Sequence, residues 1–513
     1  MTDAVDITTS QRKTILGLLK RYLPNVKVWA YGSRVKWRSR PESDLDMVVF
    51  TSPDQKREVS DLKEALEESN LPFRVDVFIW DEVPEGFRKN IEAEHVVLQE
   101  RQEQRVANEW RQSTWGEEIS LEYGKAIRGY KDAEGPYRVY GTNGPVGWTF
   151  EPLAPGPGVI LGSKRAYRGV EYSKDPFFVI DTAYYVKPKT NLHMRWLYYA
   201  IKHYNLGEID DGSPIPSTTR AAVYVRDVKI PSFEDQRAIA HILGSLDDKI
   251  ELNRQMNCTL EKMAQAIFKS WFIDFDPVRA KAEGRDPGLP KEVADLFPDS
   301  FEESELGEIP KGWTPRVVST LLDINPRLAL SKGTVARYVD MKALPTSGFS
   351  VTAVIEKEFK GGAKFQQHDV LLARITPCLE NGKTGLVDFL DGEEVGFGST
   401  EFIVLRGRNG ITKEFVYCLA RDDQFRRHCI SSMVGSSGRQ RVQNACFDHF
   451  VLAEASESIL TAFSERVRPV FEKITENSLE SVMLSKLRDT LLPEMISGEL
   501  PIPDAEKILE GVE

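Results

Sequence analysis

The amino-acid sequence predicts an α+β protein of several domains: an α/β domain over residues 1–100, then two globular α/β segments that alternate with two long helices. Three observations predict this class. The chain has 513 residues, too many for a single hydrophobic core. Its first part alternates amphipathic helix patterns with apolar strand patterns. In the remainder, a β-rich segment and a heptad-patterned helix follow one another twice.

Composition limits the classes of function that the chain can have. The net charge of −11 gives no global attraction to nucleic acid, so DNA contacts would have to come from local basic patches. No apolar run reaches the roughly 18 residues that a membrane helix needs, and the N-terminus lacks the apolar core of a secretion signal. The five cysteines show no CxxC spacing, which predicts reduced thiols in a cytoplasmic protein without a zinc site.

The elements of the N-terminal domain can be assigned in chain order. A helix is expected at residues 8–24, where a Thr or Ser N-cap precedes apolar residues at helical spacing. A strand at 26–33 would end in a Gly-Ser turn, and the continuous apolar run at 45–50 suits a strand buried on both faces. A second amphipathic helix is expected at 60–72 and a third strand at 73–80.

Carboxylates gather at two of these strands. Asp44 and Asp46 stand two residues apart, so on a strand their side chains face the same way, and Asp76 lies at the same depth in the next strand. Three such carboxylates can bind two divalent cations, which would clamp a triphosphate and activate an attacking hydroxyl. Gly32 and Ser33 offer backbone amides and a hydroxyl to phosphate oxygens. Four basic residues nearby in sequence would offset the phosphate charge: Arg34, Lys36, Arg38 and Arg40.

Exposed acids at strand ends and Gly-Ser turns also occur without such a role, but the third acid, in RVDVFIW, favours the site. Together these residues resemble the minimal nucleotidyltransferases of the DNA polymerase β superfamily, whose pattern is GS, a spacer, DxD and a distant D on a strand. The resemblance covers residues 12–98. It implies Mg²⁺ and a nucleoside triphosphate as cofactors, with Asp44, Asp46 and Asp76 as metal ligands and catalytic carboxylates. It also implies a nucleotide-binding turn of Gly32, Ser33 and Arg34.

Two later segments repeat one another. Residues 246–268 and 471–492 align without a gap, and both carry apolar residues at alternating steps of four and three. Asn253 and Asn477 fall at equivalent positions inside this heptad seam. The pattern predicts two spacer helices, at 233–276 and 456–500, that pack on each other with a register pinned by the two asparagines.

A globular segment precedes each spacer helix. Residues 108–232 and 305–455 open alike and close alike, and β-rich stretches with Gly and Pro turns lie between. Residues 277–304 are charged and Pro-rich, which predicts a linker. Residues 501–513 are left as a tail.

This arrangement resembles the DNA specificity subunit of type I restriction-modification systems over residues 108–500, most characteristically from DQRAIAHILGSLDDKIELNR to SWFIDFDP. The resemblance implies two target-recognition domains, each reading half of a split double-stranded DNA site, on antiparallel spacer helices. It implies that the helices dock methyltransferase (modification) subunits and that a restriction (translocase-nuclease) subunit joins them. No adenine-methyltransferase, Walker A or nuclease motif is found, so this part is expected to bind DNA without modifying it.

Base edges and phosphates are contacted mainly by Arg, Lys, Asn, Gln and hydroxyl side chains. Each candidate could equally be a solvated surface residue. Those in the first segment are Asn143, Lys164, Arg165, Tyr167, Arg168, Thr219 and Arg220. Those in the second are Arg374, Asn381, Lys383, Arg439, Gln440 and Arg441. An alternative reverses the roles: the chain is a nucleotidyltransferase first, and the recognition segments only deliver it to DNA.

Overall fold

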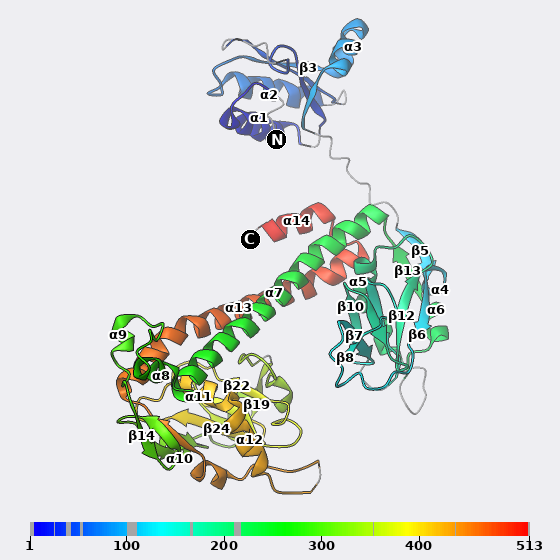
Figure 1. Cartoon of the computed structure of the whole chain (residues 1–513). Helices are drawn as coiled ribbons and strands as arrows, with labels where there is room; N and C mark the ends of the chain where they lie inside the picture. The colour runs from blue at the N-terminus through cyan, green and yellow to red at the C-terminus, as the bar shows by residue number, and fades with distance from the viewer. Residues whose placement is uncertain are drawn as a thin grey trace. The chain divides into compact units, whose positions relative to one another are not determined.

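The computed structural model of the chain describes residues 5–24, 26–36, 40, 43–51, 55–99, 110–164, 168–209, 217–351, 353–436 and 438–510. The chain divides into two compact units. One comprises Met1–Glu117 with Val225–Ser232, and the other comprises Glu118–Tyr224 with Phe233–Glu513. Helices and strands are mixed throughout, which confirms the predicted α+β multidomain class (Figure 1).

The first unit is built on a four-stranded sheet of order β3-β2-β1-β4. Strand β1 runs antiparallel to β2 and β4, whereas β2 and β3 are parallel. The strands are β1 (Val28–Tyr31), β2 (Leu45–Val49), β3 (Val75–Ile79) and β4 (Val96–Gln99). The helices are α1 (Thr9–Tyr22), α2 (Lys56–Glu67) and α3 (Glu85–Ala93). A separate antiparallel pair joins β5 (Arg111–Thr114) to β13 (Asp227–Ile230).

Sequence patterns account for most of this unit. Thr8 and Gln11 form a reciprocal capping box that starts α1. Apolar residues from α1, α2 and one face of the sheet, among them Leu19, Met47 and Leu62, make the buried core. Alternation along the strands therefore places Tyr31 and the acids on the other face, beside a smaller apolar cluster that includes Val48 and Ile91. The predicted helices and strands are all present, although α2 lies earlier in the sequence than the predicted 60–72, and α3 and β4 were not predicted.

In the second unit, residues 118–224 form a globular part that we name head one. Its larger sheet has the order β10-β9-β12-β6 and its smaller sheet the order β11-β7-β8. The strands are β6 (Ile119–Tyr123), β7 (Tyr137–Gly141), β8 (Gly144–Thr149), β9 (Gly158–Gly162), β10 (Val170–Ser173), β11 (Phe177–Val179) and β12 (Ala183–Pro188). The helices are α4 (Trp115–Glu118), which begins before the head, α5 (Met194–His203) and α6 (Arg220–Tyr224).

Two long helices, α7 (Phe233–Phe272) and α13 (Glu457–Ser497), pack along each other (Figure 1). Asn253 and Asn477 are buried in the seam, as the heptad pattern predicted. The Asn253 side-chain amide donates to the Asn477 carbonyl oxygen at 3.3 Å, and the Asn477 amide donates to Asn257 Oδ1 at 2.9 Å. A short helix, α14 (Ile502–Glu510), follows and contacts α7. No helix in the described parts of the chain is long and apolar enough to span a bilayer.

Residues 276–455 form the second globular part, named head two. It contains two four-stranded sheets, of order β17-β24-β21-β22 and β19-β18-β23-β20, and the pairs β14-β15 and β16-β25. The strands are β14 (Phe301–Ser304), β15 (Gly307–Pro310), β16 (Thr314–Val317), β17 (Leu322–Ile324), β18 (Val335–Val339), β19 (Val354–Glu358), β20 (Ala363–Phe365), β21 (Val370–Ala373), β22 (Thr384–Leu386), β23 (Gly396–Gly398), β24 (Phe402–Gly407) and β25 (Val451–Glu454). The helices are α8 (Asp276–Ala282), α9 (Lys291–Ala294), α10 (Val318–Leu321), α11 (Lys413–Arg421) and α12 (Asp423–Ser431).

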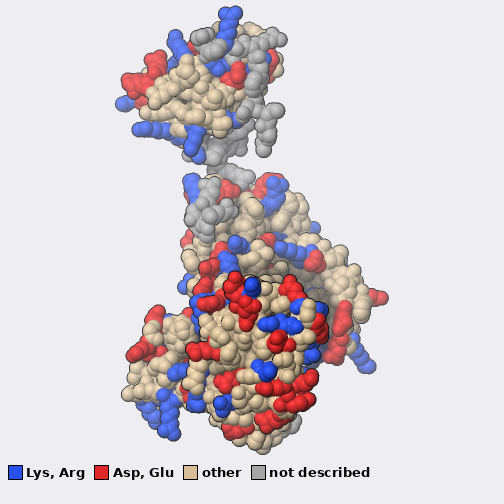
Figure 2. Space-filling view, turned by 60° about the vertical axis from the view of Figure 1, so that its left-hand side comes forward, with Lys and Arg blue, Asp and Glu red and all other residues tan. Residues whose placement is uncertain are grey.

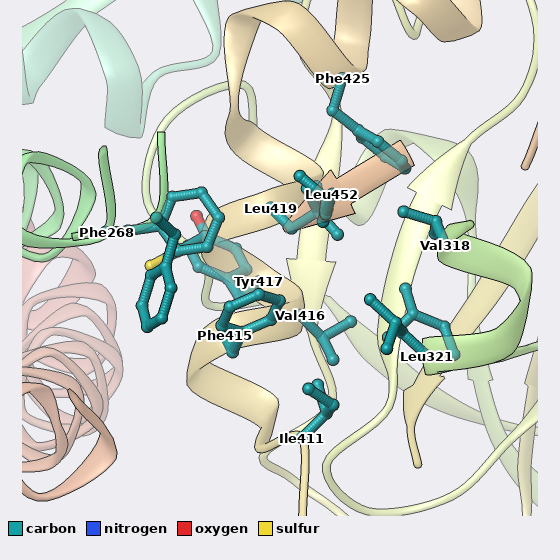
Figure 3. Close-up of a cluster of buried hydrophobic side chains, with 14 of the residues drawn as sticks. Phe268, Val318, Leu321, Ile411, Phe415, Val416, Tyr417, Leu419, Phe425 and Leu452 are labelled. Atoms are coloured by element: carbon teal, nitrogen blue, oxygen red, sulfur yellow. The ribbon is translucent and has the colours of Figure 1, made fainter. Parts of the chain in front are cut away.

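The core of head two continues into the long helices. Figure 3 shows Phe415 and Tyr417 of α11 beside Phe268 of α7, and Val416 belongs to the same buried core. The predicted linker at 277–304 is wrong in one respect, because this stretch is folded. Val278 and Phe297 are buried in the same core, and the Phe297 ring meets Trp271 edge-on at 5.0 Å. The apolar side chains of this stretch are scattered among charged ones without periodicity, too weak a signal for the sequence to predict this packing.

Candidate nucleotidyl-transfer and DNA-recognition sites

A tight turn brings the end of β1 against the first acid of the sheet. Gly32 has a φ of +84°, a conformation that residues with a Cβ rarely adopt. A Cβ at this position would stand 2.4 Å from Asp46 Oδ2. The turn then closes with a hydrogen bond from the Lys36 N–H to the Gly32 carbonyl oxygen at 3.2 Å. Ser33 lies half-buried in this turn. The glycine therefore allows backbone to lie directly against a carboxylate.

The strand register sets two acids and a tyrosine side by side. Asp46 of β2 is opposite Asp76 of β3 and opposite Tyr31 of β1. Burial raises the pKa of Asp46, and the nearby charges of Asp76 and Asp44 raise it further. Burial, with the charges of Asp46 and Asp76, raises the pKa of Tyr31 to about 12. Asp44 is exposed and precedes β2.

The acids have the chemistry that a divalent cation requires, but in the described residues their side chains are not grouped as a complete metal site. Across the part of the chain that the structure describes, no three acidic, histidine or cysteine side chains are grouped closely enough to hold a metal. Asp76 is joined to Arg74 by an ion pair of 2.9 Å. Asp46 is the more informative residue, since its pKa is raised in part by like charges, and a bound cation relieves such repulsion. Sequence reasoning named neither Tyr31 nor Arg74.

Arg34 has a different environment from the one predicted. Its side chain is buried. Nε donates to the Ser43 carbonyl oxygen and Nη1 to the Asp6 carbonyl oxygen, both at 2.9 Å. The guanidinium also lies 3.8 Å from the centre of the Phe73 ring. These contacts fix the loop between β1 and β2, so the Arg34 guanidinium has a structural role there.

The other three basic residues near the turn differ in placement. Lys36 pairs with Glu94 at 2.6 Å and Arg40 is exposed. Arg38 lies outside the described residues. A cavity of about 290 Å³ opens beside the acidic face, and its lining includes Tyr31, Phe78 and Phe87. Both phenylalanines are about half exposed.

In head one, two of the predicted DNA-contacting residues are exposed, and another forms hydrogen bonds to backbone carbonyl oxygens. Asn143, in the turn between β7 and β8, and Lys164 are exposed. Arg168 instead donates to two backbone carbonyl oxygens, those of Gly207 at 2.7 Å and Ile209 at 2.9 Å. Arg165 and Tyr167 lie outside the described residues.

The STTR loop of head one places Arg220 beside two aromatic rings, those of Tyr123 and Tyr184. Thr219 accepts a hydrogen bond from the Ala222 N–H at 3.3 Å at the start of α6. The Arg220 guanidinium lies 4.4 Å from the Tyr123 ring centre and 5.9 Å from that of Tyr184. Tyr123 is itself 53% exposed, so this cluster presents an aromatic ring at the surface with the half-buried Arg220 cation beside it, a combination suited to nucleic acid. Sequence reasoning did not single out Tyr123.

In head two, the structure brings Arg374 close to Gln440 and Arg441, which are distant from it in sequence. Arg441 forms a forked pair with Glu401, with contacts of 2.9 Å and 2.7 Å. The Gln440 N–H donates to Thr376 Oγ1 at 3.1 Å, and Arg374 Nη2 donates to the Val442 carbonyl oxygen at 3.0 Å. These contacts join the loop after α12 to the residues that follow β21 and to the residue before β24.

The remaining candidates of head two are Arg439, Asn381 and Lys383. Arg439 and Asn381 are exposed. Lys383 is half-buried and donates from Nζ to the Met341 carbonyl oxygen at 2.7 Å. On the face drawn in Figure 2, basic and acidic side chains are interspersed instead of forming one basic surface. DNA contact would therefore depend on small groups of residues.

Comparison with known proteins assigns the two parts separately. The family model for polymerase β nucleotidyltransferases matches residues 13–104, and that for type I restriction-modification DNA specificity domains matches residues 151–262. The HindI specificity subunit of Haemophilus influenzae is 27% identical over 330 residues, which cover 56% of this chain and 71% of that protein. The MjaIX specificity subunit of Methanocaldococcus jannaschii is 26% identical over 368 residues, covering 68% and 78%.

The N-terminal domain has a relative of its own. A probable protein adenylyltransferase of Haemophilus influenzae, MntA, is 37% identical over 99 residues. The match covers 19% of this chain and 87% of MntA. Both predicted resemblances are thereby confirmed. The chain thus carries a type I restriction-modification DNA specificity domain and is similar to type I specificity subunits, and its fused N-terminal domain belongs to the polymerase β nucleotidyltransferases.

Proposed function

We propose that the chain is the DNA-reading subunit of a type I restriction-modification complex, in which each head recognises one half of a bipartite double-stranded site. The main supporting observation is that α5 of head one and α11 of head two each pack against both α7 and α13. Two readers fixed to one pair of helices can meet the same face of the groove about one DNA turn, ~34 Å, apart. Relatives named as type I specificity subunits support the same assignment.

The exposed candidates are the best DNA contacts. Asn143 and Lys164 in head one, and Asn381 and Arg439 in head two, have side chains open to solvent. Arg220 with Tyr123 adds a stacked cation in head one. The candidates that bond within the heads would act by shaping the loops: Arg168, Thr219, Arg374, Lys383, Gln440 and Arg441.

The long helices would dock the methyltransferase subunits, and a restriction subunit would join this assembly. Several apolar side chains of α7 and α13 are exposed, which suits a partner surface. On α13, Leu479 and Met483 are 61% and 71% exposed and stand one helical turn apart. On α7, Leu252 and Met263 are each 50% exposed.

The N-terminal domain would transfer a nucleotide to a protein hydroxyl. Asp46 and Asp76, with Asp44, would bind Mg²⁺, which neutralises charge on the triphosphate. The Gly32–Ser33 turn would receive the phosphates. The acceptor oxygen would bond to the α-phosphorus as the bond to the bridging oxygen breaks and pyrophosphate leaves, and Asp76 would take the hydroxyl proton. The MntA relative is named as a probable protein adenylyltransferase, which supports this acceptor class.

Labelling tests the transferase part. The purified chain and its co-purifying subunits are incubated with α-labelled ATP and Mg²⁺, beside the Asp44→Ala, Asp46→Ala double variant. We expect label on a protein of the complex, and its loss in the variant. If neither labelling nor binding of the triphosphate occurs at millimolar concentration, the domain is a docking module, and the DNA-reading assignment is unaffected.

Co-purification tests the alternative role as a transferase that uses the heads for delivery. A specificity subunit should co-purify with a methyltransferase subunit, and adenine methylation mapped in cells should show one bipartite site that disappears without this chain. Absence of both would favour the delivery role.

A further inference from the structure

Each head is fixed to the long helices by a tyrosine that bonds to a carboxylate of α7. In head one, the Tyr199 hydroxyl donates to Asp247 Oδ2 at 2.6 Å. In head two, the Tyr417 hydroxyl donates to Glu261 Oε1. Both tyrosines are fully buried. We name Asp247 and Glu261 the anchor carboxylates.

The anchor of head one joins three helices. Arg488 of α13 donates from Nη1 to Asp247 Oδ1 at 2.6 Å, so Asp247 accepts from α5 and α13 while standing on α7. A second contact supports it. The Arg195 guanidinium of α5 forms a fork with Asp248, with two bonds of 2.8 Å. It packs against Gly244, where a Cβ would stand 2.7 Å from its Nε and Cζ.

The anchor of head two is more completely enclosed. Glu261 is largely buried, and besides Tyr417 its Oε2 accepts from the Gly348 N–H at 2.6 Å. Arg421 lies 3.3 Å from Glu261 and donates from Nε to the Tyr417 hydroxyl at 2.9 Å. Arg421 also donates to backbone carbonyl oxygens of head two, including Gly382 at 2.6 Å. Glu261 thus connects α7 to α11 and, through Arg421, to the loops of head two.

The two anchor carboxylates lie on the same side of one helix, α7. Asp247 and Glu261 are two heptads apart on α7, so they project from the same side of it, about 21 Å apart at ~1.5 Å per residue. Hydrogen bonds are directional and buried charged ones are costly to misalign. Apolar packing alone would tolerate a small rotation or slide of a head, whereas these bonds would not.

We propose that Asp247 and Glu261 fix the orientation of the two heads on α7 and thereby set the half-site spacing that the subunit accepts. The inference rests on the proposed bipartite reading. The two carboxylates are positioning residues: they need not touch DNA, but they determine where each head meets it. Loosening an anchor should leave the half-site sequences unchanged and widen the accepted spacing.

The test uses the full chain in complex with its modification subunits. The probes are duplexes carrying the site mapped by methylation in the wild type, with its natural spacing or with one base pair added or removed between the half-sites. A duplex with only one half-site is included. Affinity for each duplex gives a spacing preference and, separately, a sequence preference.

For Asp247→Asn and for Tyr199→Phe, we expect the preference for natural spacing to fall roughly tenfold, the scale of one charge-assisted hydrogen bond. The preference for the half-site sequences should stay unchanged. Asp489→Asn is the matched control, because Asp489 pairs with the same Arg488 but lies beside it on α13, so it joins no two helices. Tyr417→Phe makes the same test for head two and keeps the Glu261–Arg421 pair.

Variants that melt lower but keep the wild-type spacing preference would overturn the inference, because the anchors would then serve stability alone. Loss of half-site sequence preference would also overturn it. A wild-type complex that binds the single half-site as tightly as the complete site would instead refute the bipartite reading on which the inference rests.

Discussion

Gly32 and Asp46 form a contact that depends on the absence of one side chain. Gly32→Ala would place a Cβ 2.4 Å from Asp46 Oδ2 and force a residue with a Cβ to a φ of +84°. We expect the variant to destabilise the N-terminal domain by about 1–3 kcal/mol and to weaken triphosphate binding. Hydrogen exchange of the β1 and β2 amides in the full chain would measure the first effect, and equilibrium binding of ATP with Mg²⁺ the second.

Gly17→Ala is the matched control for this substitution. Gly17 lies inside α1, and nothing stands within 4 Å of the position of its Cβ. The same chemical change there should stabilise the domain by about 0.5–1 kcal/mol, since glycine inside a helix costs conformational entropy. If both variants lose stability, or if Gly32→Ala exchanges as slowly as the wild type, the close approach does not constrain the turn.

Asp46→Asn should reveal the charge conflict at the acidic face. Because the folded state raises the pKa of Asp46, the native state binds this proton more tightly than the unfolded state. This stabilising contribution is complete below the ordinary pKa of an aspartate and is lost as pH rises through the raised value. At neutral pH without Mg²⁺, the variant should therefore be more stable than the wild type.

Addition of Mg²⁺ should reverse that order, because a cation favours the ionised carboxylate and stabilises only a state that binds it. Hydrogen exchange of β2, measured with and without Mg²⁺ at several pH values, gives both comparisons. An equal response of wild type and variant to Mg²⁺ would show that Asp46 is not a ligand.

At this scale, the sequence was informative where spacing alone decides the outcome. The strand patterns predicted that Asp76 lies at the same depth as Asp44 and Asp46, and the parallel register places Asp76 opposite Asp46. It could not predict that the Arg34 guanidinium bonds to Asp6 and Ser43, because these contacts depend on loop paths. The neighbouring role of Tyr31 also depends on a strand pairing that no local pattern encodes.

Among the elements, the paired helices carry the most specific polar contacts. Asn253 Nδ2 donates to Glu480 Oε2 at 2.7 Å in addition to the Asn477 carbonyl oxygen. Buried asparagines in a heptad seam generally lower stability and select one register. They therefore act on pairing geometry more than on the strength of packing.

Replacement of both seam asparagines by leucine, Asn253→Leu with Asn477→Leu, should raise the melting temperature and loosen the register. Apolar burial replaces two polar groups, but the bonds that exclude neighbouring registers are removed. Calorimetry gives the stability, and mapping of adenine methylation gives the function, which we expect to fall. A lower melting temperature would mean that the asparagine network stabilises the pair more than leucines can.

The helices were predictable because their periodicity extends over many turns, and α7 begins within one residue of the expected start. The stretch at 277–304 was not, because its contribution to the core comes from isolated residues such as Val278 and Phe297. An apolar residue without periodicity gives no sign of which core it joins. Composition then favours the interpretation as a linker.

For the whole molecule, the proposed roles of the first unit and of the two heads follow from the kinds of binding side chain that each part exposes. The first unit gathers acids beside a glycine turn, while the heads present exposed amides and cations from loops. The net charge of −11 prevents long-range attraction of DNA by the whole chain. Recognition would therefore depend on the correct placement of two small readers, and so on the helices between them.

Exchange of one head should consequently change one half of the recognised site and leave the other half intact. The packing of the head-two core determines which residues must be exchanged together. A swap of residues 305–455 would leave Phe297 and Val278 from one parent against a core from the other, whereas a swap of 276–455 keeps them with their own head. We expect the longer chimaera to fold and to methylate a hybrid site with natural spacing, and the shorter one to be less stable because of mismatched packing around Phe297.

Mapping of adenine methylation in cells reads the site, and thermal melting compares the two chimaeras. A methylation map in which both halves change, or neither changes, would contradict independent readers, while equal melting of the two chimaeras would place residues 276–304 outside the unit that must travel with head two.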